Sequence, residues 1–369
     1  MYFSSDPSTL GGVQESIYYL TNSLRKRGHV ITIFGPAETK RYRNYQRLGK
    51  LVNVPTPNGN WSSINLWPRN GKKPSVIINE GNYDICHIQE PYIPFIAWEL
   101  LKNVKIPKVT TFYLSWDDDS VANVLKTFLP IMKKNFSLYV DGVLYVSEIA
   151  RKRWEKLCAD NVQQKIILSG LNHELLFPVK KVVKNKQVRI LFLARLVSKK
   201  GLLYLLKALS HLSREFPHLV LTVVGEGEDR KRFETYVKVN KLKKNVFFTG
   251  TVSDKKRRQL YQQADIFCAP YVDEGYGLTV LEAMACGCPI VGFRNEAFRE
   301  TLKGYPNREL LVKPRDIGAL TQALKKLIID PHLRKKIRAW GIENSRKYSW
   351  DKAAQETEDF YYQVLKSKK

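Results

Sequence analysis

Short hydrophobic runs recur along the chain, and stretches with helical periodicity separate them. In the first half these runs lie at residues 30–34, 85–88, 108–112 and 142–146. The stretch 14–27 has Ile17, Leu20 and Leu24 on one face of a helix. The runs are hydrophobic throughout rather than alternating, which is typical of parallel strands that helices cover on both faces. The pattern predicts an α/β fold in which strands and helices alternate.

The same pattern starts again in the second half of the chain. Its hydrophobic runs lie at residues 188–193, 219–224, 246–248, 265–268 and 289–291. Between the halves, residues 177–186 contain Pro, Asn and several Lys and lack helical periodicity, which predicts a linker. We therefore expect each half to form a domain with its own sheet.

The predicted architecture is two Rossmann-like, doubly wound α/β domains that face each other across a cleft. The first spans residues 1–180 and the second residues 181–349. Ligands of such sheets bind at the carboxyl ends of the strands. The last predicted helix, within residues 350–369, follows the second domain, and the sequence leaves open whether it packs back on the first.

Length and composition agree with two globular domains, since the chain has 369 residues and is 44% hydrophobic. No hydrophobic run reaches the ~18 residues that span a bilayer, and residues 1–7 lack the features of a secretory signal. Only residues 1–4 precede the first polar loop, so either the first strand is short or the chain lacks a few native residues upstream. The five cysteines form no CxxC pair and no zinc spacing, which favours a reducing cytoplasm.

The charge is the unusual feature of the composition. The chain carries 61 Lys and Arg against 35 Asp and Glu, a formal charge of +26, of which residues 1–180 contribute +8 and residues 181–369 contribute +18. Nucleic acid, anionic lipid and phosphorylated small molecules are the candidate partners. No nucleic-acid-binding motif is present, so we expect no nucleic-acid partner. Residues 120–136 fit either a membrane-surface helix or a helix packed in the core.

The segment 273–289 carries the strongest chemical signal. It follows a predicted strand and contains a glycine loop, ending at Gly277, before a short helix at 278–286. Such a loop is an anion site, because free N–H groups meet the positive end of the helix dipole there. Carboxylates beside a phosphate are unfavourable unless they bind hydroxyls, so Glu274 and Glu282 favour a sugar and a ribose as partners.

This segment resembles the E-x7-E signature of the family-four retaining glycosyltransferases, which have the GT-B fold. The resemblance extends over nearly the whole chain and is more specific in the second half. It implies that Glu282 binds the ribose of a nucleotide and that Glu274 faces the transferred sugar. It also implies that backbone amides of Tyr276, Gly277 and Leu278 hold phosphate or sugar hydroxyls.

Two cationic residues follow the first predicted strand of the second domain. The guanidinium of Arg195 and the ammonium of Lys200 at a strand end are suited to a diphosphate. They would neutralise the charge that develops as a nucleoside diphosphate leaves. The pair resembles the R-x4-K motif of the same family, and the resemblance also implies that the segment around Val252 lines the base.

The first half carries looser signals. The Gly-Gly-Val-Gln sequence at 11–14 is similar to that of phosphatidylinositol mannosyltransferases, which implies that Gly12 reaches the donor phosphates and Gln14 the acceptor side. Tyr113 stands where that subfamily has a histidine, and a phenol donates a hydrogen bond but is no base near pH 7. Asn58 is the remaining acceptor-side candidate, and the segment 58–63 has no clear match for the arginine that relatives place near a lipid phosphate.

Two other motifs suggest different chemistry, but each departs from the pattern that this chemistry requires. The Asp-x-Asp within residues 117–119 imitates a metal site, but it precedes a predicted helix, where carboxylates serve as caps. The Gly-x-Gly at 225–227 imitates a dinucleotide fingerprint but lacks the third glycine. We therefore expect neither a protein metal site nor hydride chemistry.

Together these signals predict a retaining hexosyltransferase that uses a nucleotide sugar, GDP-mannose or a UDP-sugar, and transfers the hexose to a lipid-linked acceptor. The resemblance implies front-face transfer without a cofactor, and any Mg²⁺ would lack a dedicated protein site. We expect a cytoplasmic monomer that is peripheral on the anionic inner face of the cell membrane. The alternatives are a glycosyltransferase with a soluble or polysaccharide acceptor and a nucleotide-sugar epimerase of the same fold.

Overall fold

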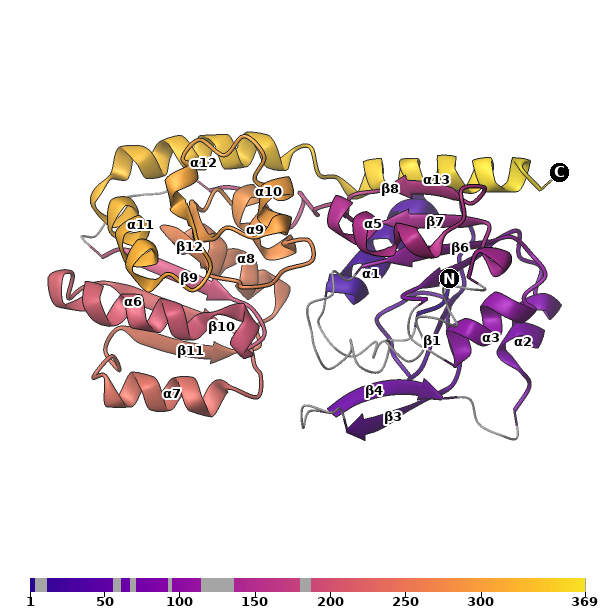
Figure 1. Cartoon of the computed structure of the whole chain (residues 1–369), viewed down its shortest axis with the longest axis horizontal. Helices are drawn as coiled ribbons and strands as arrows, with labels where there is room; N and C mark the ends of the chain where they lie inside the picture. The colour runs from indigo at the N-terminus through magenta and orange to yellow at the C-terminus, as the bar shows by residue number, and fades with distance from the viewer. Residues whose placement is uncertain are drawn as a thin grey trace. The chain divides into compact units, whose positions relative to one another are not determined.

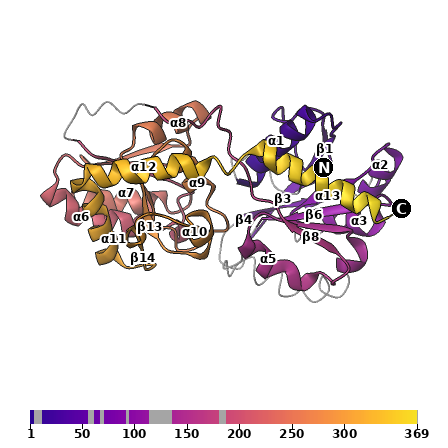
Figure 2. The same ribbon diagram turned by 90° about the horizontal axis from the view of Figure 1, so that it is seen from above.

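The computed structural model describes residues 1–3, 12–55, 61–66, 71–91, 95–113, 136–179 and 187–368. The chain divides into two compact units (Figures 1 and 2). Unit 1 consists of Met1–Gly170 and Trp350–Lys369, and unit 2 consists of Leu171–Ser349. Most of the predicted linker, residues 180–186, lies outside the described residues.

Unit 1 contains a parallel sheet in the order β5-β6-β7-β8. Its strands are β5 (Cys86–Gln89), β6 (Lys108–Phe112), β7 (Gly142–Tyr145) and β8 (Gln163–Ile166). The pair β1 (Ile33–Gly35) and β2 (Tyr45–Arg47) is also parallel, and Tyr2 bridges β1 to β5. A hairpin of β3 (Lys50–Pro55) and β4 (Trp61–Leu66), which the hydrophobic pattern did not indicate, is antiparallel.

Helices in unit 1 cover the sheet that these strands form. They are α1 (Gly12–Lys26), α2 (Pro74–Glu80), α3 (Ile96–Asn103), α5 (Glu148–Trp154) with the 3₁₀ turn Glu155–Leu157, and α13 (Trp350–Lys366). The last helix lies alongside α1 in unit 1 (Figure 2). Trp350 stacks there on Tyr19, with 5.9 Å between the ring centroids. Gly142 lets α13 approach the sheet, since a Cβ there would lie 2.7 Å from a ring atom of Phe360.

Unit 2 contains a six-stranded parallel sheet in the order β11-β10-β9-β12-β13-β14. Its strands are β9 (Arg189–Leu193), β10 (Val220–Val224), β11 (Val246–Gly250), β12 (Ile266–Ala269), β13 (Ile290–Phe293) and β14 (Leu311–Val312). The strand order reverses between β9 and β12, and ligands of open α/β sheets bind at such a switch point. Two predicted site segments follow these two strands.

The helices of unit 2 begin at side-chain caps in several places. Asn295, Asp316 and Asp330 each accept a hydrogen bond from the backbone N–H three residues on. The helices are α6 (Leu202–Glu215), α7 (Arg230–Val239), α8 (Asp254–Gln263), α9 (Leu278–Ala285), α10 (Glu296–Thr301), α11 (Ile317–Ile329) and α12 (Pro331–Ser345), with 3₁₀ turns at Ser198–Lys200 and Arg308–Leu310. The two parallel sheets with their helices confirm the predicted α/β fold class.

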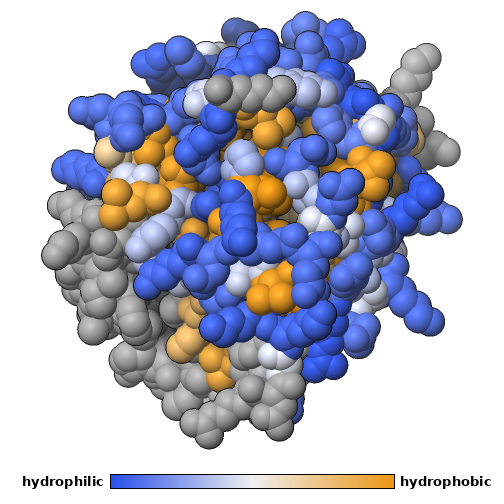
Figure 3. Space-filling view, turned by 90° about the vertical axis from the view of Figure 1, so that its right-hand side faces the viewer, coloured by the Kyte–Doolittle hydropathy of each residue, from blue (hydrophilic) through white to orange (hydrophobic). Residues whose placement is uncertain are grey.

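Figure 3 shows a mostly hydrophilic face of the molecule, on which hydrophobic patches lie between the polar side chains. Among the described residues, no helix combines the length and the apolar character that a membrane crossing requires. The helix predicted at 120–136 and the Asp-x-Asp at 117–119 lie outside the described residues, apart from residue 136.

Candidate active site

The E-x7-E segment begins where β12 ends and continues through a loop into α9. Gly277 precedes the first residue of α9 and has φ +87°, a left-handed conformation that favours glycine. Glu274 lies in the loop and Glu282 in the middle of the helix. The structure therefore places the predicted glycine loop directly before a helix N-terminus, as an anion site requires.

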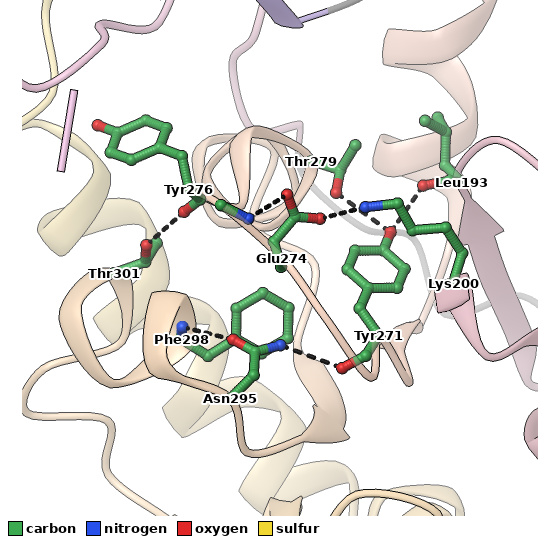
Figure 4. Close-up of polar contacts among 10 residues, drawn as sticks. Leu193, Lys200, Tyr271, Glu274, Tyr276, Thr279, Asn295, Phe298 and Thr301 are labelled. Atoms are coloured by element: carbon green, nitrogen blue, oxygen red, sulfur yellow. Dashed lines mark hydrogen bonds and ion pairs between the residues drawn. The ribbon is translucent and has the colours of Figure 1, made fainter. Parts of the chain in front are cut away.

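Glu274 pairs with a lysine from a different strand end. Lys200 Nζ lies 2.8 Å from Glu274 Oε2, and the N–H of Gly275 donates to Oε1 at 3.1 Å (Figure 4). Burial is the largest influence on the Glu274 carboxyl and acts to raise its pKa. Lys200 and the backbone N–H groups of Gly275 and Tyr276 outweigh it, so that the pKa lies below its ordinary value. Glu274 is thus held as a carboxylate.

Tyr271 connects this loop to the end of β9. Its OH donates to the carbonyl of Leu193 at 2.7 Å and lies 3.1 Å from Thr279 Oγ1 (Figure 4). Its ring centroid is 5.0 Å from Lys200 Nζ, and the side chain is fully buried. Tyr271 therefore orients Lys200 by a cation–π contact and fixes the spacing of the two loops.

The glycine loop is also held from the side of α10. Thr301 Oγ1 donates to the carbonyl of Tyr276 at 2.8 Å. Asn295 Nδ2 donates to the carbonyl of Tyr271 at 3.1 Å, and Asn295 Oδ1 accepts from the N–H of Phe298. Figure 4 shows the Thr301–Tyr276 contact at the end of the loop away from Lys200 and the Asn295 contact at Tyr271. These hydrogen bonds hold two backbone carbonyls of the loop, those of Tyr271 and Tyr276.

Sequence reasoning did not find Tyr271, Asn295 or Thr301. Each acts through hydrogen bonds to backbone atoms of residues that are distant in the chain. A tyrosine after a strand and an asparagine before a helix are common structural residues, so no local signal distinguishes them.

Arg195 lies in the turn that follows β9. Its side chain is exposed and makes no hydrogen bond or ion pair within the part of the chain that the structure describes. The next residue anchors the turn, since the N–H of Leu196 donates to the carbonyl of Glu226 at 2.8 Å and the N–H of Asp229 donates to the carbonyl of Leu196 at 3.1 Å. The guanidinium is thus presented to solvent from a fixed backbone.

The Gly-x-Gly at 225–227 explains how this anchoring is possible. A Cβ at Gly225, which has φ +126°, would lie 2.1 Å from the carbonyl oxygen of Ala194. A Cβ at Gly227 would lie 2.4 Å from the carbonyl oxygen of Leu196. These glycines therefore let the loop after β10 pack against the loop that carries Arg195.

Glu282 is buried in unit 2 and bound by α8. Its residue exposure is 7%, Tyr261 OH donates to its Oε2 at 2.9 Å, and Arg257 Nη2 lies 3.5 Å from its Oε1. Val252, the residue predicted to line a base, lies between β11 and α8 and is half-buried. Its neighbour Ser253 caps α8 by accepting from the N–H of Lys256.

The predicted residues of the first half belong to unit 1. Gly12 is the first residue of α1 and is exposed, whereas Gln14 is buried and its carbonyl accepts from Tyr42 OH at 3.2 Å. Tyr113 follows β6, and burial, followed by the charge of Glu90, raises the pKa of its phenol well above the ordinary value. Its phenol therefore stays protonated at neutral pH. Asn58 lies outside the described residues.

His87 does not supply the base that Tyr113 cannot provide. It is 2% exposed, and its ring nitrogens lie 2.5 Å from Tyr361 OH and 2.7 Å from Thr111 Oγ1. Burial, with the nearby amino terminus, lowers its pKa to about 3. The ring is therefore a neutral structural group. Among the described residues, no cluster of three or more His, Cys, Asp or Glu is arranged to hold a metal ion.

Comparison with known proteins gives a family for both halves of the chain. The pattern described as Glycosyltransferase Family 4 matches residues 10–175, and that described as Glycosyl transferases group 1 matches residues 176–344. Phosphatidyl-myo-inositol mannosyltransferase of Mycolicibacterium smegmatis is 30% identical over 350 residues, 92% of this chain and 87% of the relative. The enzyme of that name from Mycobacterium tuberculosis is 28% identical, over 97% of this chain and 94% of the relative.

A further relative and two solved structures extend the comparison. Alpha-monoglucosyldiacylglycerol synthase of Streptococcus pneumoniae is 26% identical, over 85% of this chain and 75% of the relative. Sucrose-phosphate synthase from Thermosynechococcus elongatus has a TM-score of 0.78 and 20% identity over 99% of this chain and 98% of its own. Anabaena HepE in complex with UDP and glucose has a TM-score of 0.77 and 15% identity over 97% and 98%. These structures share the fold.

The matches over both halves, the near full-length relatives and the two parallel sheets agree with one another. The chain belongs to the family-four glycosyltransferases and has their GT-B fold.

Proposed function

We propose that this glycosyltransferase moves a hexose, with retention of anomeric configuration, from a nucleoside diphosphate sugar to a lipid-linked acceptor. The proposal rests on the similarity of most of the chain to enzymes that glycosylate lipids. Three relatives that match most of the chain are named for the glycosylation of phosphatidyl-myo-inositol or of diacylglycerol. Mannose from GDP-mannose is the favoured donor sugar, since the mannosyltransferases share the higher identities.

The donor diphosphate would bind at the strand ends of unit 2. Arg195 supports this assignment because its exposed guanidinium has no partner among the described residues. Lys200 supplies a second positive charge, and the backbone amides of residues 276–278 lie at the N-terminus of α9. Glu282 would accept hydrogen bonds from the ribose, and the segment around Val252 would line the base. Gly12 of unit 1 would contribute backbone to the phosphates.

Transfer would take place on one face of the sugar. The bond between the anomeric carbon and the diphosphate oxygen breaks, and the acceptor oxygen bonds to that carbon on the same side. The acceptor proton passes to the leaving phosphate, so the step needs neither a protein nucleophile nor a cofactor. Arg195 and Lys200 would stabilise the negative charge that develops on the diphosphate, while Glu274 orients the sugar hydroxyls. Any Mg²⁺ would arrive with the diphosphate.

The acceptor would enter from unit 1 at the surface of an anionic membrane. The formal charge of +26 favours attraction to such a surface, and we place the enzyme peripherally on its cytoplasmic side. Gln14, Asn58 and Tyr113 are the acceptor-side candidates. Because the Tyr113 phenol stays protonated, its role would be to donate a hydrogen bond and not to remove a proton.

Radiolabelled nucleotide sugars incubated with purified protein and a membrane lipid extract test the proposal. Label is expected to enter the organic phase, and an Arg195→Ala, Glu274→Ala double variant should transfer at background rates. The matched control is Lys325→Ala, Glu215→Ala, which also removes one cation and one anion, from an exposed ion pair of unit 2. Normal transfer by the site variant would refute the assignment.

The form of the labelled product separates the remaining functions. Label that appears only in water-soluble glycans would favour a soluble acceptor, and a converted nucleotide sugar without added acceptor would favour an epimerase. Co-sedimentation with anionic liposomes is expected for the lipid-acceptor enzyme only. Thermal-shift screening with UDP, GDP and ADP identifies the base that the donor carries.

A further inference from the structure

Two residues on one face of α8 hold the carboxylate of Glu282. Arg257 and Tyr261 are four positions apart in α8, so their side chains project from the same side of that helix. Tyr261 OH contacts Oε2 at 2.9 Å and Arg257 Nη2 approaches Oε1 at 3.5 Å. The two oxygens of the carboxylate are therefore fixed by different groups, which sets its plane.

Arg257 and Tyr261 act differently on Glu282 because only Arg257 is charged. Burial, and then the charge of Glu282, raises the pKa of Tyr261 well above the ordinary value, so the phenol is a neutral donor. A carboxylate as buried as Glu282, at 7% exposure, is costly without a cation beside it. Arg257 supplies that cation. Its own side chain is 15% exposed and also lies 3.2 Å from Asp254 Oδ1, which limits its rotation.

We propose that Arg257 is a positioning residue of the donor site, holding Glu282 in the orientation in which its carboxylate accepts hydrogen bonds from the ribose hydroxyls. The proposal rests on the proposed function, since it takes Glu282 as the ribose ligand. Beyond the proposed function, it assigns a role to a residue of α8, the helix that follows the segment proposed to line the base. A carboxylate oxygen accepts more than one hydrogen bond, so Glu282 can keep Arg257 and Tyr261 while it binds a hydroxyl.

Loss of Arg257 should therefore weaken the preference of the site for ribose over 2′-deoxyribose in the nucleotide. A site built to bond a hydroxyl rejects the analogue that lacks it, and this rejection depends on the exact placement of the partner. Arg257→Leu should therefore weaken binding of a ribonucleoside diphosphate about tenfold and weaken binding of its 2′-deoxy analogue much less. A residue that contacted phosphate or base directly would affect both ligands equally.

The experiment is isothermal titration of the full chain with GDP and dGDP, or with UDP and dUDP if uridine is the preferred base. The measured quantity is the dissociation constant for the 2′-deoxyribonucleoside diphosphate divided by that for the ribonucleoside diphosphate. Arg257→Leu is compared with Lys256→Leu, which removes the same charge from an exposed position of the same helix. Arg257→Lys keeps the charge and should recover part of the ratio. Tyr261→Phe removes only the phenol donor and should lower the ratio by a smaller factor.

Each outcome has a clear meaning. A ratio that falls towards one in Arg257→Leu and is unchanged in Lys256→Leu supports the proposal. An unchanged ratio in Arg257→Leu, whether or not affinity falls, overturns it. If the leucine variant does not fold, a wild-type ratio in Arg257→Lys overturns it, because lysine should recover only part of the ratio. A wild-type chain that binds no nucleoside diphosphate overturns the proposed function itself. Equal binding of ribose and deoxyribose forms by the wild type overturns the ribose role of Glu282 and this inference with it.

Discussion

Lys200 and Glu274 form an ion pair between the strand-end loops of β9 and β12, with Nζ 2.8 Å from Oε2. The two side chains are only 16% and 18% exposed. In the proposed function one of them binds the diphosphate of the donor and the other the sugar. In the structure each is the partner of the other, so a donor bound as proposed would compete with this contact. Arg195 has no such partner among the described residues, so no ion pair would have to break before its guanidinium binds phosphate.

Glu274→Gln should therefore raise the affinity for a bare nucleoside diphosphate and lower the rate of sugar transfer. Without its anionic partner, Lys200 is free to pair with phosphate, and the affinity for a bare nucleoside diphosphate is expected to rise ~3- to 10-fold, about 1 kcal/mol for a partly exposed pair. Sugar transfer should fall by ~10²-fold or more, because a preorganised charge at the reacting sugar is lost. Titration calorimetry gives the first quantity and initial transfer rates the second.

The matched control is Glu215→Gln, which removes an exposed carboxylate that pairs with Lys325 elsewhere in unit 2. It should leave both quantities unchanged. Weaker binding of the nucleoside diphosphate by Glu274→Gln would mean that the ion pair orients Lys200 for phosphate and does not compete with it.

His87 should make unit 1 sensitive to acid. Its pKa is lowered to about 3 in the folded chain, against an ordinary value near 6.5. The unfolded chain therefore binds the proton first, and the free energy of unfolding should fall as pH falls from about 6.5 towards 3. The slope from this one group approaches ~1.4 kcal/mol per pH unit.

Urea unfolding between pH 7 and pH 4 tests this, with His87→Gln as the variant. The variant is expected to be less stable at pH 7, because the contacts with Tyr361 and Thr111 are disturbed, but its stability should depend less on pH. Equal pH dependence in both proteins would show that other groups cause the acid sensitivity.

The loop after β10 should control the position of Arg195 through a glycine. A Cβ at Gly227 would lie 2.4 Å from the carbonyl oxygen and 2.7 Å from the N of Leu196, both backbone atoms that cannot move aside easily. Gly227→Ala is expected to displace the turn that carries Arg195 and to weaken binding of a nucleoside diphosphate about tenfold, from ~1–3 kcal/mol of strain.

Gly318→Ala is the control for this substitution. Its Cβ would meet only Asp316 Oδ1, at an ordinary 3.6 Å, and the position is within α11. It should stabilise the protein by ~0.5–1 kcal/mol and leave binding unchanged. Unchanged binding in Gly227→Ala as well would show that the two loops adjust independently.

The sequence predicted the fold class because its signals are local. Hydrophobic runs predicted most strands of the two parallel sheets but missed β8 and β14, which are the last strands of their sheets along the chain. The run at 30–34 also begins too early, since β1 starts at Ile33 and Val30 is 93% exposed. Tyr2, which pairs with both β1 and β5, takes the place of a regular first strand. A single bridging residue has no periodicity, so no pattern could reveal it.

The candidate site is predictable from sequence to the extent that it is contiguous. One segment predicts both Glu274 and Glu282, and the pattern of strands predicts Lys200 at a neighbouring strand end. The pairing of Lys200 with Glu274 joins residues that are 74 positions apart, and it depends on the strand order of β9 and β12 and on the ring of Tyr271. Such contacts follow from tertiary structure, so local sequence could not specify them.

The packing of α13 on unit 1 should contribute a large part of that unit's stability. Trp350 is 8% exposed and stacks on Tyr19 of α1, so Trp350→Ala removes a large buried ring from the junction of the two helices. The expected cost is ~3–5 kcal/mol in the free energy of unfolding. Tyr362→Ala, at a 53% exposed position of the same helix, should cost ~0.5 kcal/mol or less. Urea midpoints and limited proteolysis of α13 measure the difference, and equal midpoints for the two variants would show that this helix does not stabilise unit 1.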